Sequence, residues 1–191
     1  LTGNEKSGIE LTHLHLKLEA NDQLISVTEL DARTKQSKLQ GDASITFENV
    51  DQFIHALGQN NISLDLPQFR IAPKDIYYFA PGLAKDTFLG PLLKNMINGS
   101  ITIRGTLDQL LIQQFDAQFG TNTQIKFNGT VSSLTEPDKL LFNLKDVHLY
   151  SVIKDFQHFV PKDSSYTLPD FVQLDGIVSG TTKKIKSTYL I

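Results

Sequence analysis

Cysteine and tryptophan are absent from the sequence, and methionine occurs once among its 191 residues. Without cysteine, the chain can form no disulfide, no thiolate metal site and no cysteine nucleophile. Long apolar runs are also missing, because no stretch approaches the ~18 residues that a membrane-spanning helix needs. The formal net charge is −3, so the basic footprint of a nucleic-acid-binding protein is lacking. We therefore expect no nucleic-acid partner.

The bulk composition is that of a folded domain. Hydrophobic residues make up 40% of the chain and charged residues 20%, which is typical of globular rather than disordered proteins. A compact chain of this length buries roughly 70% of its unfolded surface. The sequence begins with Leu1 rather than Met and has no apolar signal-peptide core. We expect a single segment over residues 1–191, cut from a longer protein.

Alternation of apolar and polar residues is the dominant pattern, and it predicts β-strands with one apolar face. The longest run covers residues 39–47, and shorter runs cover residues 62–66, 101–104 and 115–119. Near the N-terminus the apolar phase slips by one residue, and a β-bulge at residues 12–13 would absorb the slip. The sequence therefore predicts a mostly β protein.

Helices are predicted to be few and short. Asn49 and Gln52 form a capping-box pattern, so a first helix is expected after Asn49. A second helix is predicted over residues 73–79, with proline in its first turn. A third is predicted after Ser151, over residues 152–159, from apolar residues at helical spacing. The side chains of the first helix that we expect to face the core are Phe53, Ile54 and Leu57.

A pattern of an apolar residue, a polar residue and glycine recurs along the chain at Gly41, Gly99, Gly129 and Gly176. The uneven spacing of these glycines argues against a strict solenoid repeat. Glycine inside a strand usually marks a bend or a close approach of two backbones, which is one interpretation of the pattern. A two-residue hairpin turn is the alternative at Gly99 and at Asn128-Gly129. For Asn128-Gly129 the two interpretations have equal weight.

A longer internal repeat relates residues 103–106 to residues 178–181, and both copies end in Gly-Thr. Leu110 after the first copy corresponds to Ile185 after the second. Each copy predicts a strand, a tight turn or kink, and a return strand. The two copies also suggest a division of the segment into two sub-repeats, residues 1–80 and 97–191.

The sequence carries no recognisable catalytic or metal-binding motif. The serine motif G-x-S-x-G and the glycine loops that bind phosphate are both absent. His13 and His15 share one face of a predicted strand, but no third ligand stands at a metal-binding spacing, so exposed histidines are the favoured interpretation. His148 and His158 have no recognisable partner in the sequence. We expect a protein that is not an enzyme and that holds no metal or cofactor.

Several short motifs follow one another along the chain, and their order is informative. Residues 72–83 contain Asp-Ile-Tyr-Tyr-Phe-Ala-Pro-Gly-Leu, and residues 99–110 follow the pattern G-x-h-x-h-x-G-T-h-x-x-L, where h is apolar. Together with the motifs around them, over roughly residues 25–185, they resemble TamB/AsmA-like proteins of the Bacteroidota type. Two departures are visible: residues 84–98 are longer than the family's corresponding segment, and residues 135–138 match its Leu-Pro-Asp run only approximately.

The resemblance implies both a fold and a function. It implies an elongated, curved antiparallel sheet that forms a β-groove, with a few short helices. It also implies an internal periplasmic segment of an inner-membrane-anchored protein in a Gram-negative bacterium. Proteins of this family are implicated in moving phospholipid toward the outer membrane and in outer-membrane assembly with a TamA-type barrel partner. The family offers no catalytic residues to carry over.

An apolar face that stays uncovered would form the groove, and phospholipid acyl chains are its expected ligands. In the alternative interpretation, the same side chains pack against the short helices as a closed core. A different function class is a β-sandwich that serves as a protein-binding or adhesion module through its exposed edges. The candidate groove residues are Ile45, Phe47, Ile101, Ile103, Phe115, Ala117 and Phe119.

Overall fold

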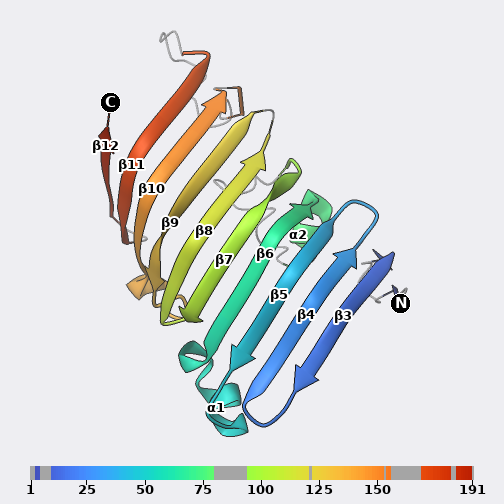
Figure 1. Cartoon of the computed structure of the whole chain (residues 1–191). Coiled ribbons are helices and arrows are strands. Elements are labelled where there is room, and N and C mark those ends of the chain that lie inside the picture. The colour runs from blue at the N-terminus through green and yellow to red at the C-terminus, as the bar shows by residue number, and fades with distance from the viewer. Residues whose placement is uncertain are drawn as a thin grey trace.

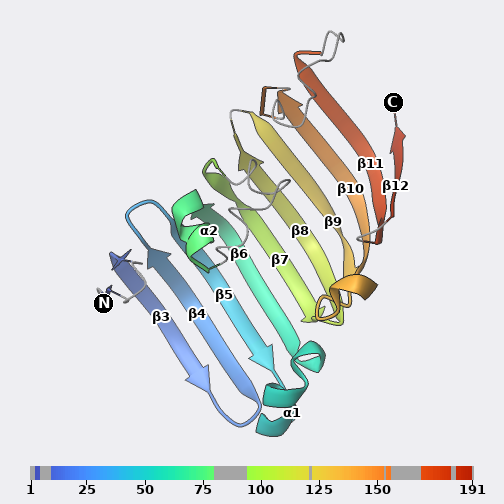
Figure 2. The same cartoon turned by 180° about the vertical axis from the view of Figure 1, so that it is seen from behind.

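The computed structural model describes residues 3–4, 10–79, 94–120, 122–152, 154–155, 169–181 and 184–190. Ten strands form one antiparallel sheet in which each strand pairs with its neighbours in the chain, from β3 at one edge to β12 at the other (Figure 1). The sheet is elongated, twisted and curved, and it does not close on itself (Figures 1 and 2). The predicted fold class, a mostly β protein with a curved antiparallel sheet and a few short helices, is confirmed.

Most strands of the large sheet are longer than the helices. A separate two-stranded sheet pairs β1 (Gly3–Asn4) with β2 (Glu10–Leu11). The helical elements are α1 (Val50–His55), η1 (Leu57–Gln59), α2 (Pro73–Phe79) and η3 (Pro137–Lys139). The large sheet consists of β3 (His13–Ala20), β4 (Leu24–Arg33), β5 (Lys38–Thr46), β6 (Asn61–Ile71), β7 (Ile97–Thr106), β8 (Gln109–Phe119), β9 (Thr123–Ser132), β10 (Leu141–Val152), β11 (Phe171–Thr181) and β12 (Ile185–Leu190).

The phase slip near the N-terminus is absorbed by a break between two strands. Strand β2 ends at Leu11, Thr12 forms a bend, and β3 begins at His13. The backbone N–H of Thr12 still donates to the carbonyl of Arg33 at 2.9 Å. The bend therefore changes the apolar phase without detaching the chain from β4.

Bulges and glycines alternate between neighbouring strands. The register shifts place an extra residue on β4, β6, β8 and β10. The four repeated glycines lie in the strands between them, so Gly41 pairs with Leu30 and Gly129 with Leu144. Because bulges increase the local twist and bend of a strand, this alternation spreads curvature across the whole sheet.

The hairpin turns that were the alternative at Gly99 and at Asn128-Gly129 are wrong. Both glycines lie inside strands, β7 and β9. A Cβ atom at Gly129 would lie 2.2 Å from the carbonyl oxygen of Asn143, and the φ of Gly129 is +149°. Glycine is therefore required here for close approach of two backbones, not for a turn.

The internal repeat that ends in Gly-Thr marks two hairpins, as predicted. Strands β7 and β8 are joined at residues 107–108, and Thr181 at the end of β11 exchanges backbone hydrogen bonds with Lys184 just before β12. The register is the same in both, because Gly105 pairs with Leu110 and Gly180 pairs with Ile185. The uneven glycine spacing reflects longer connections after β6 and after β10.

The helix predictions are correct in part. The Asn49 side chain accepts from the backbone N–H of Gln52 at 2.9 Å, and α1 follows directly. Phe53 packs on Phe47, with ring centroids 4.7 Å apart. The expectation that Ile54 and Leu57 face the core is wrong, since they are 57% and 52% exposed. The helix lies at one end of the sheet rather than over its face (Figure 1).

The second helix has the predicted bounds, and the third does not begin where predicted. Helix α2 covers Pro73–Phe79. Ser151 and Val152 belong to β10 and pair with Val172 and Phe171, so the predicted helix start is wrong. The ladder hydrogen bonds of β10 outweigh a local helical pattern at these two residues. The rest of that prediction, residue 153 and residues 156–159, lies outside the described residues.

Candidate functional site

The seven predicted groove residues lie on one face of the sheet. Directly paired residues of an antiparallel ladder project to the same side, and the ladder links Phe115 with Ile101 and links Ile103 with Leu64. The same ladder continues from Leu64 through Ala43, two residues before Ile45. The other predicted members follow at every second position of their strands: Phe47, Ala117 and Phe119.

The exposure of these side chains differs along the face. Ala117 and Phe47 are buried, at 2% and 8% exposure, and the Phe53 ring covers Phe47. The remaining five, Ile45, Ile101, Ile103, Phe115 and Phe119, are half-buried. The face is therefore packed at Phe47 next to α1 and at Ala117 toward the α2 end, and its middle retains accessible apolar surface. Binding of acyl chains to this face stays a prediction.

The apolar face extends well beyond the predicted set, and one bulge explains why part of it was missed. In β8 the apolar residues are Leu110 and Ile112 before the bulge and Phe115 after it, so the alternation changes phase. Leu110 and Ile112 are 7% and 9% exposed. Further members pair across the sheet beyond β8: Ile125, Phe127, Val131, Leu144, Leu149, Leu174 and Val178.

Aromatic stacking reinforces the centre of this face. Phe115 of β8 lies directly opposite Phe127 of β9, and their ring centroids are 4.6 Å apart at an interplanar angle of 25°. Such a pair contributes about 0.5–1.5 kcal/mol beyond its buried area. The two rings are a fixed apolar platform in the middle of the sheet.

The opposite face is polar and carries ion pairs both between and within strands. Glu29 accepts from Lys17 and lies 3.5 Å from the Nε2 of His15. The Arg33 guanidinium donates to both carboxylate oxygens of Asp31, at 2.8 and 2.6 Å, and this lowers the pKa of Asp31 to about 2. The lysine likewise lowers the pKa of Glu29. The two faces of the sheet therefore differ sharply in polarity.

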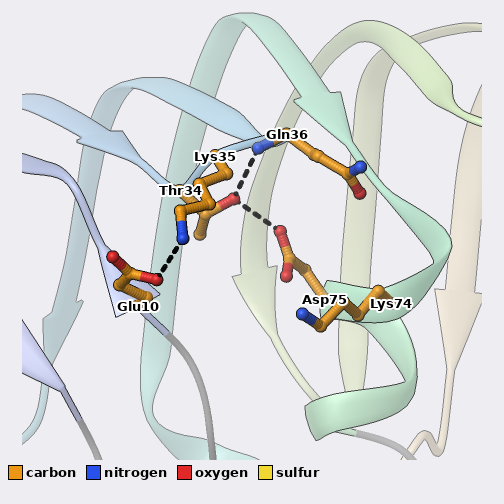
Figure 3. A pocket seen from close by; sticks show the side chains of 6 residues that line it. All are labelled: Glu10, Thr34, Lys35, Gln36, Lys74 and Asp75. Carbon is orange, nitrogen blue, oxygen red and sulfur yellow. Dashed lines mark hydrogen bonds and ion pairs between the residues drawn. The ribbon is translucent and has the colours of Figure 1, made fainter.

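A small polar cavity of about 150 Å³ lies where the β4–β5 hairpin meets α2 (Figure 3). The hydroxyl of Thr34 donates to the carboxylate of Asp75 at 2.7 Å, and the Ser37 hydroxyl donates to the same oxygen. The Ser37 oxygen in turn accepts from the backbone N–H of Ala72 at 2.8 Å. Asp75 therefore fastens the start of α2 to the hairpin, and these groups serve to position the chain.

The same arrangement recurs in the second half of the sheet. Thr123, at the end of the β8–β9 hairpin, donates to the carboxylate of Asp155 at 2.7 Å. Its hydroxyl also lies 2.6 Å from the Ser151 hydroxyl, and both residues are fully buried. Asp155 follows β10 as Asp75 follows β6. The prediction of sub-repeats 1–80 and 97–191 itself stays a prediction.

The partner of His148 was not found by reasoning from the sequence. His148 on β10 contacts Asp175 on β11, its direct cross-strand partner, although the two are 27 positions apart in the sequence. No sequence motif signals a pair that only the strand register brings together. Within the described part of the chain, no group of three or more potential metal ligands gathers around one point. No helix among the described residues is long and apolar enough to cross a membrane.

Comparison with known proteins gives no assignment. No family model, no curated protein and no solved structure matches the chain. The ten described long strands form one sheet, whereas the sandwich considered above needs two packed sheets. The sandwich architecture is therefore not the fold of these strands.

Proposed function

We propose that this chain is a non-enzymatic periplasmic segment of an inner-membrane-anchored envelope protein in a Gram-negative bacterium. In this proposal, its apolar sheet face carries phospholipid acyl chains toward the outer membrane or assists outer-membrane assembly. The observation that carries the proposal is the apolar face, whose paired side chains continue from β3 to β11 of the open ten-stranded sheet. The family resemblance supplies the compartment and the TamA-type barrel partner of the full-length chain.

The energetics favour an acyl chain as the ligand of this face. Each CH₂ group removed from water contributes about 0.8 kcal/mol, so an alkyl chain gains affinity with every strand that it crosses. The middle of the face offers half-buried Ile101, Ile103 and Phe115 as contact surface. Exposed apolar area of this extent commonly marks ligand or partner contact. An acyl chain has no hydrogen-bonding group along its length, so no polar side chain is needed to hold it on this face.

The open edges of the sheet are compatible with a segment that passes lipid onward. Strands β3 and β12 are each paired on one side only within the sheet. An antiparallel meander can be continued at either edge by another strand, which would prolong the apolar face. Protein binding through these edges is the second candidate function, and Ile185 of β12, at 68% exposure, favours it.

Native mass spectrometry of the gently purified chain, with lipid extraction in parallel, tests the proposal. We expect phospholipid to remain bound to the chain and to be recovered in the extract. The edge-binding alternative predicts a lipid-free chain that forms oligomers through β12. A folded, lipid-free monomer would contradict the lipid proposal.

A further inference from the structure

The polar face carries an ordered row of charged side chains over four strands. Asp116 of β8 pairs with Lys126 of β9, Lys126 with His148 of β10, and His148 with Asp175 of β11. Directly paired residues share a face, so the row runs straight across the sheet. The two terminal carboxylates bracket Lys126 and His148, so the row has more acidic groups than lysines.

A second row, two residues further along each strand, is made of amides and one aromatic ring. Gln118, Gln124, Tyr150 and Gln173 are successive cross-strand partners. The ring of Tyr150 stacks with that of Phe171, with centroids 6.0 Å apart and an interplanar angle of 25°. Tyr150 and Phe171 are 42% and 55% exposed. Two stacked aromatic rings therefore stand in solvent beside a row of amides.

Hydrogen bonds hold the polar side chains of the two rows in place. Asp116 accepts from the Gln124 amide at 3.1 Å and pairs with Lys126 at 2.9 Å. Asp175 accepts from His148 and from the Gln173 amide, the latter at 3.0 Å, and these two bonds lower the pKa of Asp175. An amide has two N–H donors and one acceptor, so one bond to a carboxylate does not exhaust its capacity. The surface is thus ordered and still able to bind.

We propose that this surface, defined by Lys126, His148, Tyr150, Phe171, Gln173 and Asp175, binds a neutral glycan chain. The C–H face of a pyranose ring packs on an aromatic ring, and its hydroxyl groups hydrogen-bond to amides and carboxylates beside that ring. The depression between the two rows is open and holds about 210 Å³. This is below the ~300–1,000 Å³ of small-molecule pockets, so it fits one sugar ring of a longer polymer.

The chemistry of the surface favours binding over hydrolysis and favours a neutral ligand. Asp116 and Asp175 are separated by three strand spacings, or ~14 Å, which exceeds the ~5–10 Å between the carboxyl groups of glycosidases. Among the described residues that line the depression there is no serine, threonine or cysteine. The first row has two carboxylates and one lysine, which offer no attraction for a polyanion.

Titration of the purified chain with cellohexaose and with hexa-N-acetylchitohexaose, two neutral hexasaccharides, tests the proposal. We expect saturable binding of at least one of them with a Kd of roughly 1 mM or tighter, read by isotope-edited NMR so that the shifted residues are located. Shifts are expected on β9, β10 and β11 around Tyr150. Absence of binding of both hexasaccharides to the folded chain would overturn the proposal.

Variants separate stacking from nonspecific effects. The double substitution Tyr150→Ala with Phe171→Ala should weaken binding at least tenfold, whereas Tyr150→Phe should retain most of the affinity. Leu111→Ala is the matched control, because Leu111 is an apolar side chain that is 44% exposed on β8 outside this surface. Equal affinity of the double variant and the control, or preferential binding of heparin, would overturn the proposal. The apolar face is not involved, so lipid binding and glycan binding fail independently.

Discussion

The hydroxyl of Thr123 donates a 2.7 Å hydrogen bond to the carboxylate of Asp155, which ties the β8–β9 hairpin to the residues that follow β10. The corresponding bond in the first half joins Thr34 of the β4–β5 hairpin to Asp75 of α2, also at 2.7 Å. In each half, one carboxylate fixes where the chain goes after it leaves the sheet. These two bonds organise connections that strand pairing alone does not hold.

Replacing Thr123 with valine should destabilise the fold by about 1–3 kcal/mol, because Ser151 and Asp155 lose a buried hydrogen-bond partner. Urea denaturation followed by circular dichroism measures the change. Thr130→Val is the matched control on the same strand, since Thr130 is exposed and should change stability by no more than about 0.5 kcal/mol. Equal effects of the two substitutions would show that the buried hydroxyl contributes nothing.

Alanine at Gly129 should cost at least ~2 kcal/mol. The φ of +149° is unfavourable for any residue with a Cβ, and the new atom would lie 2.2 Å from the Asn143 carbonyl oxygen. Thr130→Ala, at the next position, serves as the control in the same denaturation assay. A Gly129→Ala variant as stable as its control would contradict the close strand approach described for β9 and β10.

Acid should weaken the fold partly through Asp31. Its pKa is lowered to about 2 by the Arg33 guanidinium, below an unfolded value of ~3.9. A carboxylate with a depressed folded pKa stabilises the fold above its unfolded pKa, and this contribution is lost as the pH falls through the folded pKa. The stability difference between the unchanged chain and Asp31→Asn should therefore be full near about pH 6 and vanish toward about pH 2. Urea midpoints measured across this range check the prediction. A difference that stays constant with pH would contradict it.

Strand alternation predicted most of the sheet because burial of one face imposes a period of two on every strand. The prediction failed where a bulge changed the phase, as between Ile112 and Phe115, because the extra residue breaks the period of two that identifies a strand. Gly129 was ambiguous for a related reason. An Asn-Gly pair suits a hairpin turn, and only the neighbouring strand shows that close backbone approach decides the position.

Side-chain pairs between residues far apart in the chain could not be predicted from the sequence. His148 and Asp175 meet because the β10–β11 register aligns them, and the connection between these strands has no pattern that fixes the register. The Asp155 bond to Thr123 depends on the pairing of β9 with β10, which places the start of β9 beside the end of β10. For helix α1 the local feature was predictable, since Asn49 marked the N-cap. The exposure of Ile54 was not predictable, because it depends on the position of the helix at the end of the sheet.

The most direct test of acyl-chain binding compares phospholipid binding by two variants, one altered on each face of the sheet. Ile103 is half-buried on the apolar face, and Leu111 is 44% exposed on the polar face one strand away. Both become aspartate, and each folded variant is titrated with a phospholipid that carries a fluorescent acyl chain. We predict that Ile103→Asp loses binding at least tenfold and that Leu111→Asp binds like the unchanged chain. Equal binding by the two variants, or none by the unchanged chain, would contradict an acyl-chain site on the apolar face.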